Sequence, residues 1–424
     1  MELIVQKSRG ISGVVKAPPS KSYTHRAVII ASLANGKSVL TDPLNSEDTL
    51  SSLKACREFG ANIGKFKDYW LVEGNGGKLK TPHDVLDVKN SGTTLRIMTS
   101  VAGLAPEYSV FTGDISLKTR PMQHILDALK PLGVEAISSR GDGKPPIIVK
   151  GGFKGGKSSI PGNVSSQFIS SILIAGALAP EPLELEVTGE FISRPYVDMT
   201  LDVMGKFGVN VVYDSDKKIF KVNPQTYQAV DYTIEGDYSS ASYLVGAAAV
   251  MGGEITIKNL FKDSKQGDKI ILDIVSQMGA RIEIKDDEVM VTSDGNLKGI
   301  DIDLHNAPDL LPTVSALGAL AEGTTEISGV EHARFKETDR ISTCAQELAK
   351  LGVNVKEKPD GMAILGGVKS GIVQSHGDHR LVMALSLVGL KVGVKIQNAG
   401  VYDVSFPNFP EVMNSLGCRM ELKK

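Results

Sequence analysis

The sequence predicts a mixed α/β protein made of six repeats, three in each of two domains. Three observations lead to this prediction. A short hydrophobic–Gly–hydrophobic ending recurs six times along the 424 residues, at intervals of about 65–75 residues. The stretch before each ending repeats the same order of helix-like and strand-like patterns. Six such repeats exceed what one hydrophobic core holds, because single cores stop growing at about 250–300 residues.

The six endings predict helices that stop at a glycine. A glycine at this place adopts the left-handed conformation that ends a helix, and it does so without the steric cost of a Cβ atom. A strand-like pattern then follows. The glycines are Gly60, Gly133, Gly208, Gly279, Gly352 and Gly417.

Each repeat opens with a small polar cluster and a helix rich in Ala, Leu and Ile. The first of these helices follows Ser20-Lys21-Ser22 and carries apolar residues at i, i+3, i+4 and i+7 from Ala27. A short β-branched strand comes next, and after a charged loop a second helix runs to the glycine. The predicted strands are 109–112, 185–188, 254–258, 325–328 and 394–397. Each repeat is therefore a strand–helix–strand–helix–strand unit.

The division into domains follows from the third ending. A polar stretch comes after that ending, and we predict the crossover near Ile234–Gly236. The first domain is then 16–235, and the second is 236–424 together with 1–15. Residues 3–5 and 14–15 look like strands that precede the first helix, and they could pair with the second domain and make it discontinuous.

Composition excludes several classes of function. Lys and Arg number 47 and Asp and Glu number 49, so the net charge is −2. A nearly neutral chain is not built for bulk binding to nucleic acid or to a membrane surface. Aromatic residues make up only 5%, which argues against base-stacking surfaces. Any anion must therefore be bound by a local cluster of cations.

Cysteines and apolar stretches indicate a cytoplasmic protein. The longest apolar stretch, 244–251, is far too short to span a bilayer, and the first residues lack the apolar segment of a secretion signal. Cys56, Cys344 and Cys418 are odd in number, far apart and without CxxC spacing. We expect reduced thiols, with neither a disulfide frame nor a zinc site.

Polar clusters stand at the predicted N-termini of the helices, in two sets. Helix N-termini carry unsatisfied N–H donors and partial positive charge, so they attract phosphate or carboxylate groups. Ser, Thr and Asn at such places are also ordinary N-caps, and capping explains each cluster taken alone. The first set is 20–22, 90–93, 165–167, 238–240, 307–309 and 377–380, and the second includes 118–121, 193–196, 334–340 and 405–407.

Cations beside these clusters favour anion binding over simple capping. Arg pairs with carboxylate and phosphate through two parallel hydrogen bonds, while Lys acts as a point charge. A site with this lining suits a substrate that carries two or more anionic groups. The cations are Lys21, Arg26, Arg96, Arg120, Lys336, Arg340 and Arg380.

Plainer explanations remain open for several of these residues. Lys21 could be a solvated lysine in a turn, and Asp309 could do no more than cap its helix. Glu337 lies three residues before Arg340, a spacing that is also typical of a surface ion pair. His379 could be structural, and the histidines show no spacing typical of a metal site.

Taken together, the motifs resemble those of the 3-phosphoshikimate 1-carboxyvinyltransferase (EPSP synthase) family of enolpyruvyl transferases. Single motifs are weak, but the combination is specific and covers the whole chain in the family's order and at its intervals. The motifs are Pro19–Ser22 with Thr24 and Arg26, Asn90–Thr93 with Arg96, Arg120–Met122, Ser165–Phe168, Arg334 with Lys336–Arg340, and Asp378–Arg380.

The resemblance implies an inverted α/β barrel of two domains, each of three βαβαββ repeats, that close over the substrates. It implies transfer of the enolpyruvyl group of phosphoenolpyruvate to the 5-hydroxyl of shikimate 3-phosphate, with release of phosphate, on the shikimate pathway to chorismate and the aromatic amino acids. The first domain would face shikimate 3-phosphate, and the second would carry the phosphoenolpyruvate side and the catalytic Lys and Glu. No metal or organic cofactor is implied, and we expect a monomer.

The resemblance also assigns residues to the two substrates. Those expected to face shikimate 3-phosphate are Lys21, Ser22, Arg26, Ser165, Ser166, Gln167, Ser193, Tyr196, Asp309 and Lys336. Those expected to bind phosphoenolpyruvate are Lys21, Gly92, Arg120, Gln167, Arg340 and Arg380, with Asn90 and His379 near it.

The chemistry of the residues fits this reaction. Addition across the enol double bond needs one proton delivered to the methylene carbon and one removed from the attacking hydroxyl, and two carboxylates in separate roles can do this. Our hypothesis is that Glu337 exchanges protons with the methylene carbon and that Asp309 orients and deprotonates the hydroxyl. Lys21 and Lys336 would stabilise developing negative charge.

The chain departs from the family pattern at two places. Val404 stands where many relatives have a Lys that reaches phosphoenolpyruvate, and His332 stands where some have Asn. Gly92 is retained and leaves room beside phosphoenolpyruvate, so we predict competitive inhibition by glyphosate.

Two alternatives remain. UDP-N-acetylglucosamine 1-carboxyvinyltransferase also has six repeats, but it usually carries a Cys on a mobile loop, whereas here no Cys lies between Cys56 and Cys344. That enzyme typically shows Lys-Asn where this chain has Lys21-Ser22. A non-catalytic binder of phosphorylated metabolites would keep the cations but would not need both Asp309 and Glu337.

Overall fold

The computed structural model describes residues 1–423, which form two compact units. The central unit is 19–234, and the terminal unit is 1–18 together with the chain from residue 235 onwards. The boundaries thus lie three residues and one residue from the predicted ones.

Each unit contains three four-stranded sheets. In the central unit the strand orders are β14 (Tyr232–Thr233)–β3 (Lys37–Thr41)–β5 (Tyr69–Glu73)–β4 (Asn62–Lys65), β6 (Leu86–Asp87)–β7 (Tyr108–Thr112)–β9 (Ile147–Lys150)–β8 (Glu135–Ser138), and β10 (Gly156–Pro161)–β11 (Leu183–Thr188)–β13 (Ile219–Val222)–β12 (Val212–Asp214). In the terminal unit they are β2 (Ile11–Lys16)–β15 (Gly253–Lys258)–β17 (Glu288–Ser293)–β16 (Arg281–Ile284), β18 (Asp301–Asp303)–β19 (Thr324–Ser328)–β21 (Gly361–Leu365)–β20 (Asn354–Lys358), and β22 (Gly371–Gln374)–β23 (Val394–Gln397)–β1 (Glu2–Gln6)–β24 (Arg419–Lys423).

All six sheets share one topology, which confirms the six predicted repeats, three per unit. The first strand in each order is parallel to the second, and the remaining neighbours are antiparallel. The same holds in the terminal unit. The five strands predicted from β-branched runs are β7, β11, β15, β19 and β23.

The six glycines that were expected to end helices do so in the left-handed conformation. Their φ angles run from 81° at Gly352 to 119° at Gly279. A strand follows each of them within a few residues, as at Gly133, where β8 begins two residues later. The repeat is thus visible in the sequence because one backbone conformation recurs that glycine adopts at low cost.

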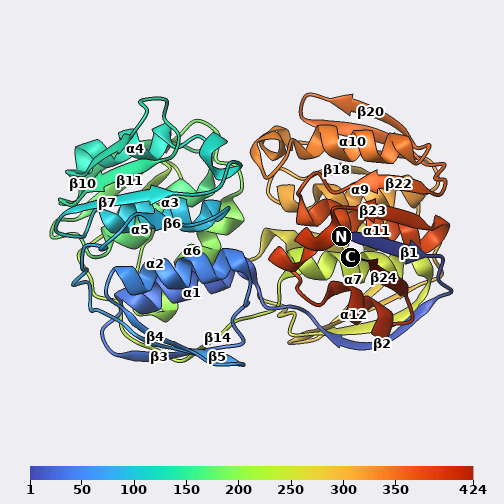
Figure 1. Cartoon of the computed structure of the whole chain (residues 1–424), viewed down its shortest axis with the longest axis horizontal. Coiled ribbons are helices and arrows are strands. Elements are labelled where there is room, and N and C mark those ends of the chain that lie inside the picture. The colour runs from blue at the N-terminus through green and yellow to red at the C-terminus, as the bar shows by residue number, and fades with distance from the viewer. Residues whose placement is uncertain (424) are drawn as a thin grey trace. The chain divides into compact units, whose positions relative to one another are not determined.

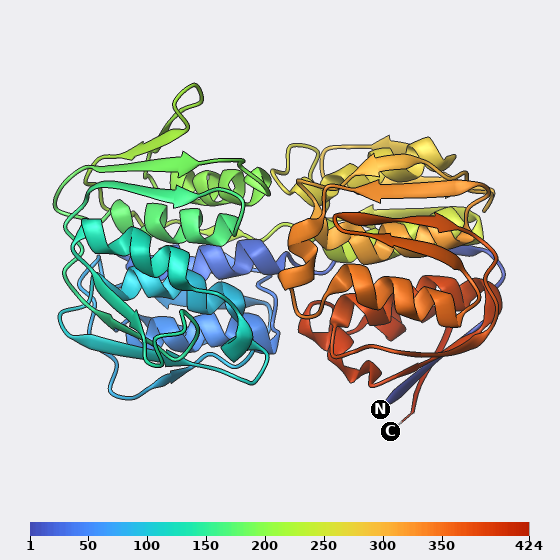
Figure 2. The same cartoon turned by 90° about the horizontal axis from the view of Figure 1, so that it is seen from above.

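Two kinds of helix build each unit. Three are buried around almost their whole circumference: α1 (Lys21–Leu33), α3 (Gly92–Ala102) and α5 (Ser166–Gly176) in the central unit, and α7 (Tyr238–Met251), α9 (Leu311–Leu320) and α11 (His379–Val392) in the terminal unit. The others cover them with one apolar face: α2 (Glu47–Glu58), α4 (Gln123–Leu129), α6 (Arg194–Lys206), α8 (Ile271–Met278), α10 (Arg340–Lys350) and α12 (Phe409–Ser415). Figures 1 and 2 show the sheets on the outside of each unit.

Short 3-10 helices connect these elements: η1 (Leu117–Thr119), η2 (Lys130–Leu132), η3 (Gly267–Ile270), η4 (Pro308–Leu310), η5 (Glu331–Phe335) and η6 (Ala399–Val404). Four of them, η1, η3, η4 and η5, lie at or next to the polar loops on which the candidate site depends.

The N-terminal strands belong to the terminal unit. β1 pairs with β23 and β24, so the two chain ends lie side by side (Figure 1), and β2 pairs in parallel with β15, with Ile11 opposite Gly253. Strands from the two ends of the chain can join the sheets of this unit because each sheet that packs on the buried helices removes a large apolar surface from water.

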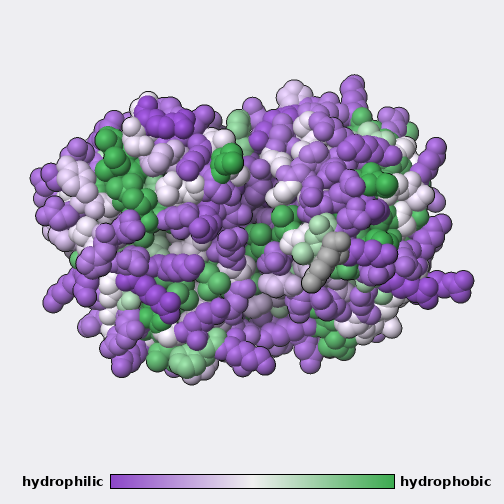
Figure 3. Space-filling model, viewed as in Figure 1, coloured by the Kyte–Doolittle hydropathy of each residue, from purple (hydrophilic) through white to green (hydrophobic). Residues whose placement is uncertain are grey.

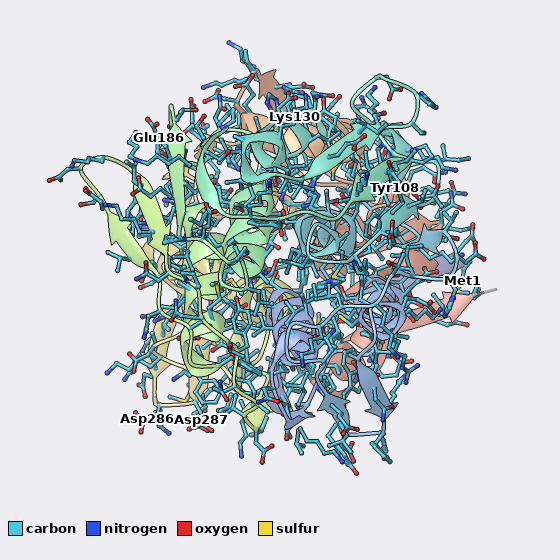
Figure 4. The ribbon with its side chains drawn as sticks, turned by 90° about the vertical axis from the view of Figure 1, so that its left-hand side faces the viewer. Met1, Tyr108, Lys130, Glu186, Asp286 and Asp287 are labelled. Atoms are coloured by element: carbon cyan, nitrogen blue, oxygen red, sulfur yellow. The ribbon has the colours of Figure 1, made fainter. Side chains whose placement is uncertain are left out.

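The surface is mostly hydrophilic on the face in Figure 3, with small separate hydrophobic patches. Charged side chains such as Lys130 and Glu186 lie at the periphery of the central unit (Figure 4). Among the helices of residues 1–423, none combines the length and the apolar character needed to cross a membrane.

Candidate active site

The N-termini of the buried helices carry the predicted polar clusters. Ser20 caps α1, Ser91 caps α3 and Ser165 caps α5, each by accepting a hydrogen bond from a backbone N–H of the first turn. The capping interpretation is therefore correct for these serines. The neighbouring residues Lys21, Gly92 and Ser166 begin the three helices, where the remaining N–H donors and the helix dipole favour an anion.

Lys21 is held by a buried carboxylate on the next helix. Its Nζ lies 2.9 Å from Asp48 Oδ2, and His25 Nε2 lies 3.4 Å from Asp48 Oδ1. Burial alone would raise the pKa of Asp48, but the charges of Lys21 and His25 outweigh it and hold that pKa well below its usual range. His25 in turn is hydrogen-bonded to Ser52 at 2.8 Å. Lys21 is thus fixed at the start of α1 and is not a loose surface lysine.

The starts of α3 and α5 are joined by side chains. Gln167 Nε2 donates to Thr93 Oγ1 at 3.0 Å, and Arg96 Nη1 donates to Gln167 Oε1 at 2.8 Å. Arg120 covers the first residue of α3, because a Cβ atom built on Gly92 would lie 2.5 Å from Arg120 Nη1. Gly92, Arg120 and Gln167, all expected near phosphoenolpyruvate, are therefore neighbours.

Arg26 is buried and ties α1 to α6. Its Nε donates to Thr200 Oγ1 at 2.7 Å, Nη1 to the carbonyl of Ser22 at 2.9 Å and Nη2 to the carbonyl of Tyr196 at 2.8 Å. Burial lowers the pKa of Arg26 to about 10, so the guanidinium still carries its charge at neutral pH. Ser193, at the start of α6, has φ 53° and is buried.

In the terminal unit, one guanidinium gathers three carboxylates. Arg340 Nη1 lies 2.7 Å from Asp309 Oδ1, Nη2 lies 2.5 Å from Glu337 Oε2, and Nε lies 2.7 Å from Asp378 Oδ2. The Arg340 side chain is only 1% exposed. The Glu337–Arg340 pair is therefore not the solvated surface pair that the spacing alone allowed.

Asp309 contacts two further cations. Its Oδ2 lies 3.0 Å from Arg380 Nη2, and its Oδ1 lies 3.4 Å from Lys336 Nζ. No side chain caps η4 or α9, so Asp309 is not an N-cap residue. The Arg380 guanidinium also donates to the Ser239 hydroxyl at the start of α7. We call Asp309, Glu337, Arg340, Asp378 and Arg380 the Arg340 cluster.

The charges of the Arg340 cluster support one another. Burial alone would lower the pKa of Arg340, but Asp378, Glu337 and Asp309 raise that pKa above its ordinary value. Burial would likewise raise the pKa of Asp378, yet Arg340 keeps it lowered. Arg340 therefore stays charged, and it favours the ionised form of the buried Asp378.

Two histidines lie beside this cluster. Burial, together with the nearby charge of Lys336, lowers the pKa of His332 to about 4, so its imidazole is neutral at neutral pH. His379 is buried in the first turn of α11, with Nδ1 3.9 Å from Asp378 Oδ1. Asn90 directly precedes the residue that caps α3.

Two functional candidates were missed by sequence reasoning. Asp48 holds Lys21, and Asp268 in η3 is buried close to Asp309 and Arg380. An acidic residue in the first turn of a helix, as Asp48 is, looks like an ordinary partner of the helix dipole. Asp268 follows Gln266-Gly267 in a charged loop and gave no local signal.

The fold, with cations and paired carboxylates at helix N-termini, is typical of enzymes that handle anionic substrates. Comparison with solved structures gives the same fold: EPSP synthase from Acinetobacter baumannii matches with a TM-score of 0.85 at 27% identity, covering 100% of both chains. The family model "EPSP synthase (3-phosphoshikimate 1-carboxyvinyltransferase)" matches residues 5–413. This chain therefore belongs to the EPSP synthase family.

Similar proteins carry the same description. The 3-phosphoshikimate 1-carboxyvinyltransferase of Methanothermobacter thermautotrophicus is 63% identical over 422 residues, covering 100% of both chains. That of Methanosphaera stadtmanae is 54% identical, covering 98% of this chain and 99% of its own. That of Methanocaldococcus jannaschii is 49% identical, covering 99% of each.

Proposed function

We propose that this chain transfers the enolpyruvyl group of phosphoenolpyruvate to the 5-hydroxyl of shikimate 3-phosphate, giving 5-enolpyruvylshikimate 3-phosphate and phosphate. The observation that carries this proposal is the sharing of the Arg340 guanidinium by Asp309 and Glu337. Two carboxylates held by one cation can act on neighbouring atoms of the same reacting group. Membership in the EPSP synthase family and the names of the similar proteins support the same reaction.

The proposed chemistry is addition followed by elimination. The 5-hydroxyl oxygen bonds to C2 of phosphoenolpyruvate while Asp309 takes the hydroxyl proton, and Glu337 gives a proton to the methylene carbon, which becomes a methyl group. In the second step the C2–O bond to phosphate breaks, Glu337 takes a proton back from the methyl group, and phosphate leaves with the proton that Asp309 had taken from the hydroxyl. Lys21 and Lys336 stabilise the negative charge that develops.

The assignment of residues to substrates is part of this proposal. The N-termini of α1, α5 and α6 in the central unit would bind shikimate 3-phosphate, and their helix dipoles and nearby cations support that role. The start of α3 with Arg120, and the Arg340 cluster, would bind phosphoenolpyruvate. The individual residues are those named in the sequence analysis.

The alternative reaction is not favoured. The family model and the similar proteins carry the name of the shikimate enzyme, and they do not carry that of UDP-N-acetylglucosamine 1-carboxyvinyltransferase. We further propose a cytoplasmic monomer. The three cysteines are free and buried, which fits a reducing compartment.

Phosphate release tests the function directly. The purified chain is mixed with phosphoenolpyruvate and either shikimate 3-phosphate or UDP-N-acetylglucosamine, and inorganic phosphate is measured over time. We expect release only with shikimate 3-phosphate. Release with the nucleotide sugar would favour the alternative, and binding of both shikimate-pathway substrates without any release would indicate a non-catalytic binder.

Replacing Gly92 with Ala should weaken phosphoenolpyruvate binding. The added Cβ would meet Arg120 Nη1 at 2.5 Å, so this flexible side chain must move, while the backbone of Gly92 is already helical. We expect KM for phosphoenolpyruvate to rise about tenfold, the loss of roughly one good contact, with KM for shikimate 3-phosphate unchanged. Gly205→Ala, at an exposed position on α6 with open space around it, is the matched control. Equal effects of both substitutions would refute the placement of Arg120.

Glyphosate should inhibit competitively with phosphoenolpyruvate. The reason is that glycine, which has no Cβ atom, lets Arg120 Nη1 lie against the start of α3, where we propose that both phosphoenolpyruvate and glyphosate bind. Initial rates at several concentrations of glyphosate and phosphoenolpyruvate test this. Inhibition that does not weaken as phosphoenolpyruvate rises would contradict the prediction.

A further inference from the structure

A buried carboxylate that the proposed mechanism does not use lies beside the Arg340 cluster. Asp268 belongs to η3, and its exposed fraction is 4%. The loop before it is held against the start of α7, because Gln266 Oε1 accepts a hydrogen bond from the backbone N–H of Tyr238 at 3.0 Å. The position of Asp268 is thus fixed by the 3-10 helix η3, to which it belongs, and by the hydrogen bond of Gln266 two residues before it.

Asp268 and Arg380 share one hydroxyl group. Ser239 acts on Asp268 as a side-chain hydrogen-bond partner that lowers its pKa, and Arg380 Nη1 donates to the Oγ of the same serine. Because arginine can only donate, Ser239 Oγ accepts from Arg380 and its O–H is left to donate to Asp268. Ser239 and Arg380 are themselves buried, with exposed fractions of 5% and 4%. The result is a continuous relay from η3 through α7 to α11.

The relay continues to the proposed general base. The other terminal nitrogen of Arg380, Nη2, lies 3.0 Å from Asp309 Oδ2. One guanidinium is therefore held between Ser239 on one side and Asp309 on the other, which leaves its planar fork little freedom to rotate. Without the hydrogen bond to Ser239, the Arg380 guanidinium would be free to turn towards Asp309.

We propose that Asp268 is a positioning residue, which acts through the hydroxyl of Ser239 to orient Arg380 for the anionic substrate. This inference rests on the proposed function, in which Arg380 binds phosphoenolpyruvate. It assigns Asp268 no contact with substrate and no proton transfer to it.

The charge state of Asp268 gives the role a recognisable signature. Burial, together with the negative charge of Asp309, raises the pKa of Asp268 to about 7, while Arg380 acts in the opposite direction and Asp237, the N-cap residue of α7, adds to the rise. Asp268 is therefore mostly neutral at pH 6 and mostly ionised at pH 8. Ionised Asp268 places a negative charge next to the binding cation, which opposes a second anion there.

Four variants test the proposal: Asp268→Ala, Asp268→Asn, Ser239→Ala and the double variant Asp268→Ala/Ser239→Ala. For each, the Kd of phosphoenolpyruvate in the presence of shikimate 3-phosphate is measured by calorimetry, and phosphate release gives KM for both substrates. Asp273→Asn, at an exposed acid in α8, is the matched control. Melting temperatures show which variants remain folded.

We expect Asp268→Ala and Ser239→Ala each to raise Kd and KM for phosphoenolpyruvate about tenfold, while KM for shikimate 3-phosphate changes less than about twofold. The double variant should be no worse than the worse single one, because both remove the same relay. Asp268→Asn keeps an oxygen that accepts from Ser239, so it should match wild type at pH 6. At pH 8 it should bind phosphoenolpyruvate about threefold more tightly than wild type, because it lacks the charge.

Several outcomes would overturn the inference. Multiplied effects in the double variant would show that Asp268 and Ser239 act independently. If the ratio of the Kd of phosphoenolpyruvate for Asp268→Asn to that for wild type stayed constant from pH 6 to pH 8, the charge of Asp268 would have no effect on binding. This comparison can still be made if Asp268→Ala does not fold. If the wild-type chain binds phosphoenolpyruvate but releases no phosphate, only the proposed function is refuted. The Kd values of phosphoenolpyruvate for the variants then still test the positioning role of Asp268. A wild-type chain that does not bind phosphoenolpyruvate refutes both.

Discussion

Replacing Glu337 with Gln is expected to lower kcat by about 10²- to 10⁴-fold, the usual contribution of a general acid–base group. The amide oxygen of Gln can still accept the hydrogen bond from Arg340 Nη2, now 2.5 Å from Glu337 Oε2, so the local geometry should survive. The amide cannot give a proton to the methylene carbon or take it back. Turnover should therefore fall while KM for shikimate 3-phosphate stays within about twofold of wild type.

The control for this prediction is Glu331→Gln. Glu331 is an exposed acid in η5, on the same segment as Glu337, and no role is proposed for it. Its replacement should leave kcat unchanged. If Glu337→Gln turned over at the wild-type rate, Glu337 would have no part in the proton transfers, and Asp309 or a solvent molecule would have to serve both steps.

Replacing Arg340 with Met should cause the largest loss of stability of any single substitution considered. Met fills a similar volume but leaves Asp309, Glu337 and Asp378 without the guanidinium that each now contacts. Removing one partner of a buried ion pair costs about 3–5 kcal/mol, because Asp378, whose side chain is fully buried, keeps its charge without its cation. The melting temperature of the terminal unit should fall accordingly, and activity should be lost with it.

The pH dependence of this loss has a definite sign. In wild type, Arg340 keeps the pKa of Asp378 lowered, so this carboxylate contributes stability above its unfolded pKa and loses that contribution as pH falls through the folded one. In Arg340→Met the carboxyl of Asp378 is buried without its cation, and its protonation at low pH removes the cost of burying that negative charge. The difference in melting temperature should be largest at neutral pH and should narrow as the solution becomes acidic.

Arg334→Met is the matched control for Arg340→Met. Arg334 also pairs with two carboxylates, Asp339 at 2.8 Å and Glu357 at 2.9 Å, but its side chain is 22% exposed. Water can solvate the partners that remain, so the cost should be about 1 kcal/mol or less. Similar losses for both variants would mean that burial of Arg340 is not what makes its ion pairs important.

The sequence by itself determined the repeat and the local chemistry of the site. Each of these features depends only on the conformational preferences of residues that are close together in the chain. They are the six glycines that end helices, the caps at Ser20, Ser91 and Ser165, and the β-branched strands. These short-range preferences recur in every repeat, so they could be recognised without knowing which elements touch. They also placed Lys21 and Arg380 at helix starts.

Only the tertiary structure decided which charges share a partner. Asp48 and Lys21 lie on different helices, and Ser239 and Arg380 are 141 residues apart. Local patterns do not show whether Glu337 and Arg340 face water or the interior, and burial of Arg340 made that pair part of a three-carboxylate cluster. The physical reason is that the strength of an ion pair depends on desolvation and on neighbouring charges. Both are set when helices distant in the chain bring their N-termini together, and neither is encoded in spacing.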